Sequence, residues 1–204
     1  MIRIWGRTNS VNVKKALWCL EELSLPYERI DAGMQYGVVN TPEYRQMNPN
    51  GLVPTLDEDG FILWESHSIV RYLASKYGKG VLWPTDLRAL AVANQWMDWS
   101  FSFQNVFRDV FWGLVRTPPE KRDLKLIAEK QKKAGEMLGI LDGALASRHY
   151  VAGMFSMGDI PIGCHVQLWM RLPIERPSQP NLEAWFERLC ARTAFKKIVD
   201  IPPT

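Results

Sequence analysis

The stretch from Asn48 to Ser66 constrains the fold of this chain more than any other. Two short apolar runs, 52–56 and 61–64, flank a turn of acidic residues and glycine, and this arrangement predicts a β-hairpin. Pro54 has no N–H to give to a sheet, so we expect it at a strand start, an edge or a bulge. The hairpin ends at Glu65-Ser66, where the Ser66 hydroxyl is expected to cap a following helix.

The two ends of this stretch suit an extended peptide. A cis peptide bond between Val53 and Pro54 would turn the main-chain groups of Val53 toward an open groove, although most bonds before proline are trans. At the far end, a carboxylate, a hydroxyl and the free N–H groups of a helix start can hold charged groups. The ligand that these groups suit best is a peptide with an ammonium and a carboxylate at one end.

Composition excludes several classes of protein. The chain has 204 residues, enough for one large domain or two small ones, and its net charge of +3 is too small to predict a nucleic-acid surface. No apolar run approaches the roughly 18 residues of a membrane helix, and the N-terminus has no signal-peptide pattern. Cys19, Cys164 and Cys190 lie far apart without metal-ligand spacing, so we expect no disulfide, no metal and a cytoplasmic, reducing location.

The first part of the chain reads as an α/β unit. Strands are predicted at Ile2–Trp5 and Tyr27–Ile30, and a helix with an apolar stripe lies between them, which is typical of a parallel strand pair. A short helix at Pro42–Gln46, the hairpin and a helix at Ser68–Tyr77 complete a predicted domain of residues 1–78. Glycines and Pro84 mark a linker at 79–86.

The rest of the chain, residues 87–204, predicts an all-helical domain without strands. Its expected helices are Leu87 to about Leu114, Lys121–Ala146, Asp159–Arg171 and Leu182–Ala191. Ser156 and Asp159 have the spacing of a capping box before the third of these helices. Pro161 would remove one helix hydrogen bond, so we expect a distorted first turn there.

The segment from Thr8 to Asn12 joins the first strand to the first helix, where ligands bind in α/β units. Ser10 and Asn12 can donate hydrogen bonds to an anion such as a thiolate, whose formation they would favour. The same two residues could equally be ordinary helix caps, which on spacing alone is the more frequent role. Cys19 falls on the apolar stripe, so we expect an inert buried thiol, and His67 is expected at the surface or at a cap.

Together these motifs resemble the glutathione transferase family, in particular its bacterial theta-like and nu-like members. The resemblance covers nearly the whole chain and rests on Ser10-Val11-Asn12-Val13-Lys14-Lys15, Asn48-Pro49-Asn50-Gly51-Leu52-Val53-Pro54, Trp64-Glu65-Ser66, Phe155-Ser156-Met157-Gly158-Asp159-Ile160 and Leu182-Glu183-Ala184-Trp185-Phe186. It implies a thioredoxin-like first domain, a helical second domain and a homodimer. It also implies glutathione as co-substrate.

The resemblance assigns roles to residues of this chain. Ser10 would hydrogen-bond the glutathione sulfur, with Asn12 as a second donor or substitute. Leu52, Val53 and the cis Pro54 would hold the cysteinyl part, and Glu65 and Ser66 the γ-glutamyl end. Ser156 and Asp159 would have a structural role, and the electrophile would lie near Tyr36, Phe103, Phe107 and Trp112. Relatives often carry a basic side chain at or beside the Gly51-Leu52 position, where this chain has none, so the contact to the glycyl carboxylate is unassigned.

Three functions follow from this reading. The leading one is conjugation, in which the glutathione thiolate attacks a small hydrophobic electrophile. The second is glutathione-dependent disulfide or peroxide reduction, as nu-like relatives suggest. The third is a non-catalytic glutathione-binding or assembly module.

Overall fold

A small mixed sheet organises the first part of the molecule. The computed structural model describes residues 1–202. The sheet contains β1 (Ile2–Trp5), β2 (Tyr27–Ile30), β3 (Thr55–Glu58) and β4 (Phe61–Trp64) in the order β2-β1-β3-β4. β1 and β2 are parallel, whereas β1–β3 and β3–β4 are antiparallel, which confirms the predicted hairpin and parallel pair.

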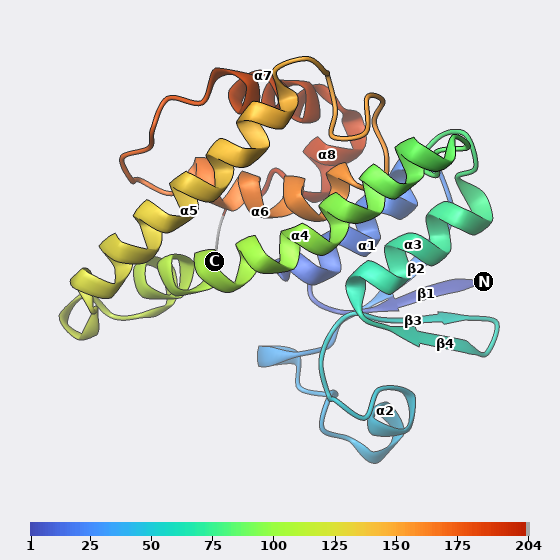
Figure 1. Ribbon diagram of the computed structural model, residues 1–204. Helices are drawn as coiled ribbons and strands as arrows, with labels where there is room; N and C mark the ends of the chain where they lie inside the picture. Colours follow the sequence, from blue (N-terminus) through green and yellow to red (C-terminus); the bar gives the residue numbers. More distant parts are fainter. Residues whose placement is uncertain (203–204) are drawn as a thin grey trace.

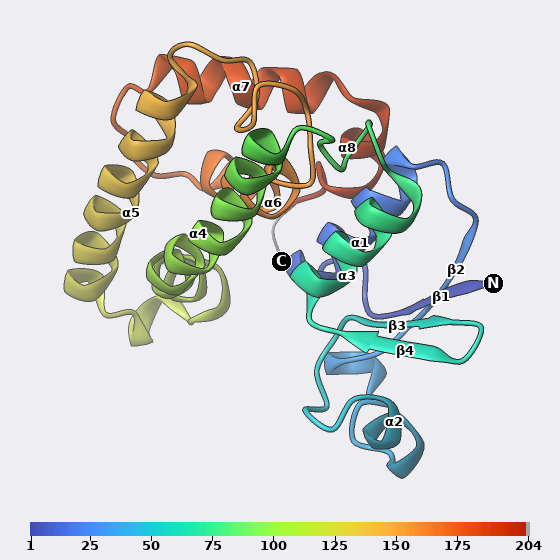
Figure 2. The same cartoon turned by 45° about the vertical axis from the view of Figure 1, so that its right-hand side comes forward.

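Helices cover this sheet on both faces. α1 (Val11–Glu22) and α3 (Ser66–Tyr77) lie on one side, next to the helical domain, and the short α2 (Pro42–Met47) lies on the other side (Figures 1 and 2). A 3₁₀ turn, η1 (Met34–Tyr36), precedes α2. This arrangement confirms the expected thioredoxin-like first domain.

The second part of the described chain is helical. It contains α4 (Leu87–Phe111), a π-helical turn η2 (Trp112–Arg116), a 3₁₀ turn η3 (Pro119–Lys121), α5 (Leu124–Leu145), α6 (Asp159–Arg171), α7 (Pro180–Ala191) and α8 (Thr193–Ile198). α4 and α5 form a long antiparallel pair, and α6 runs through the middle of the domain (Figure 1). None of the helices in the described range 1–202 is long and apolar enough to cross a membrane.

α1 lies between the sheet and the helical domain. Every residue of α1 from Val13 to Leu20 is buried, including Lys14 and Lys15, because α3 and the sheet cover one side while α6 and α8 cover the other. Trp18 makes ring contacts with Phe155 and Phe195, with centroid distances of 5.7 and 5.0 Å. The two domains therefore share one continuous core.

The start of α6 differs from the expectation in one respect. The Asp159 carboxylate accepts a hydrogen bond from Ser156 N (3.0 Å), as the capping box predicts, and the Ser156 hydroxyl accepts one from Gly158 N (3.3 Å). Pro161 is the third residue of the helix, where an N–H would have no helical acceptor. The prediction that it removes a helix hydrogen bond was therefore wrong.

Candidate functional site

Strand register brings three loop segments to one end of the sheet. Trp5 at the end of β1 is paired with Thr55 at the start of β3, and Thr55 is paired with Trp64 at the end of β4. The residues just beyond these positions are therefore neighbours. They are the loop that leads to Ser10, the Val53–Pro54 pair and the Glu65-Ser66 pair.

Ser10 occupies the N-cap position of α1, but its hydroxyl makes no capping hydrogen bond. Its backbone is extended (φ −82°, ψ 122°), and the side chain is largely buried on the wall of a cavity. The simple reading of Ser10 as a helix cap therefore does not account for its hydroxyl. The hydroxyl is available to a group inside the cavity.

Asn12 also lines the cavity, and a buried lysine fixes its orientation. Lys15 Nζ donates a hydrogen bond to Asn12 Oδ1 (2.9 Å) and contacts His67 Nε2 (3.1 Å) and Gln104 Oε1 (3.4 Å). Because the amide oxygen of Asn12 faces the lysine, its NH₂ group remains as a donor for the cavity. Burial lowers the pKa of Lys15 to about 8, so the lysine keeps most of its positive charge at neutral pH.

The Val53–Pro54 peptide bond is cis, as the hypothesis required. Two buried side chains fix the position of this loop. Tyr44 Oη and Asn48 Nδ2 both donate hydrogen bonds to the carbonyl oxygen of Leu52 (2.7 and 2.9 Å). Within residues 1–202, the N–H and C=O of Val53 make no hydrogen bond. They are therefore free to pair with an extended ligand.

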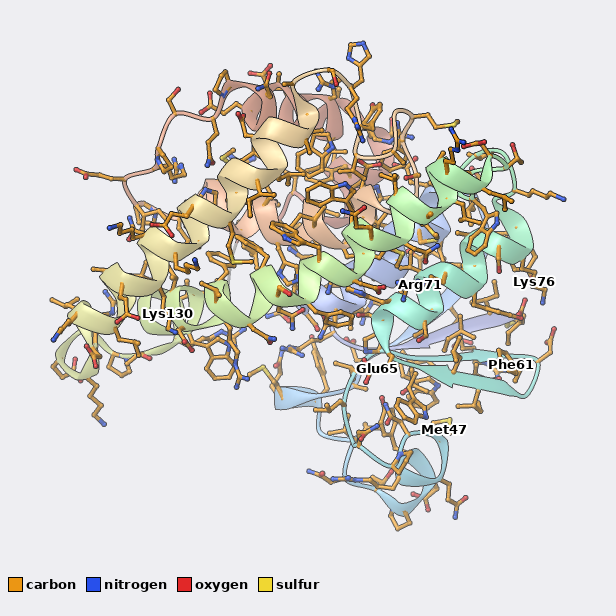
Figure 3. The ribbon with its side chains drawn as sticks, in the orientation of Figure 1. Met47, Phe61, Glu65, Arg71, Lys76 and Lys130 are labelled. Atoms are coloured by element: carbon orange, nitrogen blue, oxygen red, sulfur yellow. The ribbon has the colours of Figure 1, made fainter. Side chains whose placement is uncertain are left out.

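Glu65, not Ser66, is the N-cap of α3. Glu65 has a positive φ of 71°, its side chain is exposed, and Figure 3 shows it at the junction of β4 and α3. Ser66 is the first residue of the helix and is buried, so the expected cap by its hydroxyl is corrected. Neither residue is among those that line the main cavity, although both adjoin its Val53 wall through the strand register.

The cavity has a volume of about 450 Å³ and lies between the two domains. One wall comes from the loops at the end of the sheet and includes Ser10, Asn12, Leu52 and Val53, and the other comes from the helical domain and includes Phe107, Phe111 and Trp112.

Two predicted members of the electrophile wall lie elsewhere. Tyr36 is half exposed outside the cavity lining, and Phe103 is fully buried in a stack with Trp99 and Phe107. Phe103 lies on the side of α4 that packs against the core, and only the opposite side of the helix can face the cavity.

Three arginines in the cavity wall were missed at the sequence level. They are Arg7 from the loop after β1, Arg108 near the end of α4 and Arg116 at the end of η2. Only Arg7 could have been predicted from the sequence, because it lies in the same segment as Ser10. Gln104 and His165 line the cavity as well, and His165 Nε2 lies 3.1 Å from Gln104 Oε1.

Two other sequence expectations concern buried groups. Cys19 is fully buried, and burial raises the pKa of its thiol far above the usual range, as an inert thiol requires. His67 is also buried, with its ring centroid 3.9 Å from that of Phe101, and Glu65 is the N-cap of α3, so the prediction of a surface or cap position was wrong. The helical domain covers it, and no local pattern in the sequence shows that contact.

Comparison with known proteins gives consistent matches over the whole chain. Residues 9–76 match the model of the glutathione S-transferase N-terminal domain, and residues 103–193 match that of the C-terminal domain. The chain is 44% identical over 206 residues to glutathione S-transferase GstB of Escherichia coli K12, covering 99% of each chain. It is 26% identical to the probable glutathione S-transferase GSTF1 of Oryza sativa, covering 98% of this chain and 96% of that one.

A solved structure matches equally well. The theta class glutathione S-transferase of Xanthomonas axonopodis pv. citri, with glutathione bound, superposes with a TM-score of 0.95 at 48% identity and covers 100% of this chain and 99% of that chain. The sequence motifs, the paired domains and these matches agree. The chain belongs to the glutathione S-transferase family.

Proposed function

We propose that the protein conjugates glutathione to small hydrophobic electrophiles, with Ser10 and Asn12 stabilising the glutathione thiolate. The observation that carries this proposal is the Ser10 hydroxyl, which is not used for capping and lies on the wall of the interdomain cavity. The glutathione bound in the Xanthomonas relative supports the choice of ligand.

In this proposal glutathione lies along the end of the sheet. Its cysteinyl part pairs with the free N–H and C=O of Val53, as an added strand pairs with an edge. Its γ-glutamyl end reaches Glu65 and the first N–H groups of α3, where an ammonium and a carboxylate each find an opposite charge. The sulfur then lies near Ser10.

The chemistry needs a thiolate at neutral pH. A free thiol has a pKa of about 8.5, so only a small fraction is ionised. Hydrogen bonds from the Ser10 hydroxyl and the Asn12 amide, with the Lys15 charge behind Asn12, favour the ionised form. The thiolate attacks the electrophilic carbon, a C–S bond forms, and the leaving group departs with its electron pair.

The test is the effect of Ser10→Ala, Asn12→Ala and the double variant on turnover of 1-chloro-2,4-dinitrobenzene. Loss of one hydrogen-bond donor to the developing anion is expected to lower kcat by about 10²-fold, with a larger loss in the double variant. An ultraviolet titration of bound glutathione should show the thiol pKa rising toward that of the free thiol in the same order.

Ser147→Ala serves as the matched control, because Ser147 is exposed beyond the end of α5. It should leave both turnover and thiol pKa unchanged. Unchanged turnover in the double variant would contradict the proposed mechanism. Reduction of disulfides or peroxides without conjugation products would instead favour the reductase alternative.

A further inference from the structure

Two hydrogen-bond donors hold the side chain of Gln104 in the wall of the interdomain cavity. Its Oε1 lies 3.4 Å from Lys15 Nζ and 3.1 Å from His165 Nε2. An ammonium group can only donate, so the atom of Gln104 that faces Lys15 must be the amide oxygen. Burial lowers the pKa of His165 well below its usual value, so its ring is neutral and its one N–H points at the same oxygen.

This arrangement leaves the NH₂ group of Gln104 available to a ligand. Within residues 1–202, Gln104 Nε2 makes no hydrogen bond. Gln104 is half-buried and lines the cavity, so a bound molecule can reach this NH₂ group. The amide cannot turn over, because its NH₂ would then face the ammonium of Lys15. The donor therefore has a fixed direction before any ligand binds.

Gln104 also lies next to both parts of the reaction site. Lys15 Nζ donates to Asn12 Oδ1 (2.9 Å) and contacts Gln104 Oε1, so the two amides share one ammonium and are neighbours. Asn12 is on the side where we place the glutathione sulfur. On α4, Gln104 shares the face that carries Phe107 and Phe111 into the cavity wall. Its NH₂ group therefore lies between the sulfur and the apolar surface for the electrophile.

We propose that Gln104 is a catalytic residue that acts on the electrophile, by donating a hydrogen bond to an oxygen that becomes negative as the thiolate attacks. This inference rests on the proposed conjugation and adds a second donor to it, since Ser10 and Asn12 act on the sulfur. A donor that is fixed before the reaction stabilises the transition state without reorganisation. Only electrophiles in which charge moves onto an oxygen depend on Gln104, whereas those that lose a halide do not.

Two aromatic electrophiles represent these two kinds. In 4-phenyl-3-buten-2-one the thiolate attacks the carbon that carries the phenyl ring, a C–S bond forms, and the electrons of the C=C bond move until the carbonyl oxygen is an enolate anion. Gln104 stabilises this anion and keeps its own proton, and solvent then protonates the carbon next to the carbonyl. The thiol proton has already gone to solvent, so a thiol has been added across the double bond. In benzyl chloride the C–S bond forms, the C–Cl bond breaks and the charge leaves with chloride.

The experiment measures kcat/KM for the enone and for benzyl chloride, each divided by its uncatalysed rate with glutathione. Gln104→Met removes the NH₂ group at similar size and should lower the enone value by about 10- to 100-fold and the benzyl chloride value by less than about 3-fold. The benzyl chloride value reports any lost support for Lys15, because both reactions use the same thiolate. Gln104→Glu keeps an acceptor for Lys15 and His165 but not the donor, and should lower the enone value at least as much.

Asn105→Leu is the matched control, because it removes an amide from the next, exposed position of α4, outside the cavity lining. It should alter neither value. Equal fractional losses for the two electrophiles in Gln104→Met would overturn the inference, because Gln104 would then only support Lys15. An unchanged enone value in that variant would overturn it as well, and so would wild-type turnover of benzyl chloride without turnover of the enone.

Failure of the proposed conjugation gives a different pattern, namely no turnover of either electrophile by the wild-type enzyme. In that case a spectroscopic measurement tests the hydrogen bond without catalysis. The conjugate of glutathione with the enone keeps the carbonyl group, and infrared difference spectra with an isotope-labelled carbonyl report its hydrogen bonding in the complex. A lower carbonyl stretching frequency in the wild-type complex than in the Gln104→Met complex would support the inference. Equal frequencies would overturn it.

Discussion

Lys15 of α1 makes buried polar contacts with His67 of α3 and, across the boundary to the helical domain, with Gln104 of α4. Lys15 Nζ lies 3.1 Å from His67 Nε2 and 3.4 Å from Gln104 Oε1. Burial, followed by the nearby charges of Lys15 and Arg71, lowers the pKa of His67 to about 2. His67 is therefore neutral in the folded protein throughout the physiological range.

The neutral His67 makes stability depend on pH in a defined direction. An unfolded histidine has a pKa of about 6.5, so as pH falls below 6.5 the unfolded state binds a proton that the folded state does not. The contribution of His67 to stability is complete above pH 6.5 and is lost progressively toward pH 2. In His67→Gln, the fall in unfolding free energy below pH 6 should be shallower than in wild type by about 1.4 kcal/mol per pH unit.

Urea denaturation at several pH values checks this prediction. His149 is exposed, so His149→Gln should leave the wild-type slope unchanged. Burial raises the pKa of Asp159 to about 6, so this group makes stability change with pH in the opposite direction. Its contribution is the same in all three proteins. Equal slopes for His67→Gln and wild type would contradict the assignment of a buried neutral histidine.

The residues of the candidate site could be proposed from the sequence, whereas the burial of Lys15 and His67 could not. Local rules about loops after strands drew attention to Ser10, Asn12 and Val53, whereas their roles and the cis bond before Pro54 were expected from the family resemblance. His67 was expected at the surface or at a cap, and no local pattern marks Lys15 as a buried residue. Their burial depends on contacts with distant parts of the chain, such as that of Lys15 with Gln104, 89 positions away, and that of His67 with Phe101.

At the scale of the element, the start of α6 depends on one carboxylate. Asp159 is fully buried and accepts hydrogen bonds from Val151 N (3.0 Å), Ser156 N (3.0 Å) and Trp185 Nε1 (2.9 Å). It thus joins the loop before the helix, the helix itself and α7. The capping-box spacing predicted the Ser156 contact, whereas the contact with Trp185 arises only from the packing of α7.

Asp159→Ala should therefore destabilise the protein by about 4 kcal/mol, because three buried donors lose their acceptor together. Trp185→Phe removes one donor, keeps most of the ring packing and should cost about 1 kcal/mol beyond any packing loss. Denaturant unfolding of the two variants checks the order of these effects. A smaller loss in Asp159→Ala than in Trp185→Phe would show that the carboxylate does not organise this region.

Helix ends that local residues mark were predicted from the sequence, whereas a helical turn without such marks was not. The ends of α2 and α3 were predicted to within about two residues, since Pro42 begins α2 and Gly78 follows α3. The π-helical turn η2, which carries Arg116 into the cavity wall, was not predicted, and Thr117 N donates to Trp112 O (2.9 Å) across it. π-Helical turns are rare and often occur at functional sites.

At the scale of the whole molecule, the two domains are joined through α1. Arg192 makes a two-pronged ion pair with Glu22 (2.7 and 2.6 Å), and Lys197 pairs with Glu21 (2.7 Å), so the region of α8 is bound to the end of α1. The buried apolar residues of both parts belong to one cluster, so the predicted linker at 79–86 does not divide the core.

This shared core predicts a single cooperative unfolding transition. Far-ultraviolet circular dichroism and tryptophan fluorescence should give the same midpoint in urea, because neither domain keeps its core without the other. Trp18→Ala should lower that common midpoint, with a loss of about 3–5 kcal/mol. Two separated transitions would mean that the domains unfold independently. Phe61→Ala, at an exposed position on β4, should leave the midpoint nearly unchanged.

The position of α1 also has a consequence for synthesis on the ribosome. α1 is made among the first 22 residues, yet the side of it that carries Trp18 is covered by Phe155 and Phe195, which are made near the end. N-terminal domains usually fold as soon as they emerge. In this chain an apolar helix face stays open to water until almost all of the protein has left the exit tunnel, which gives chaperones a long period in which to bind it.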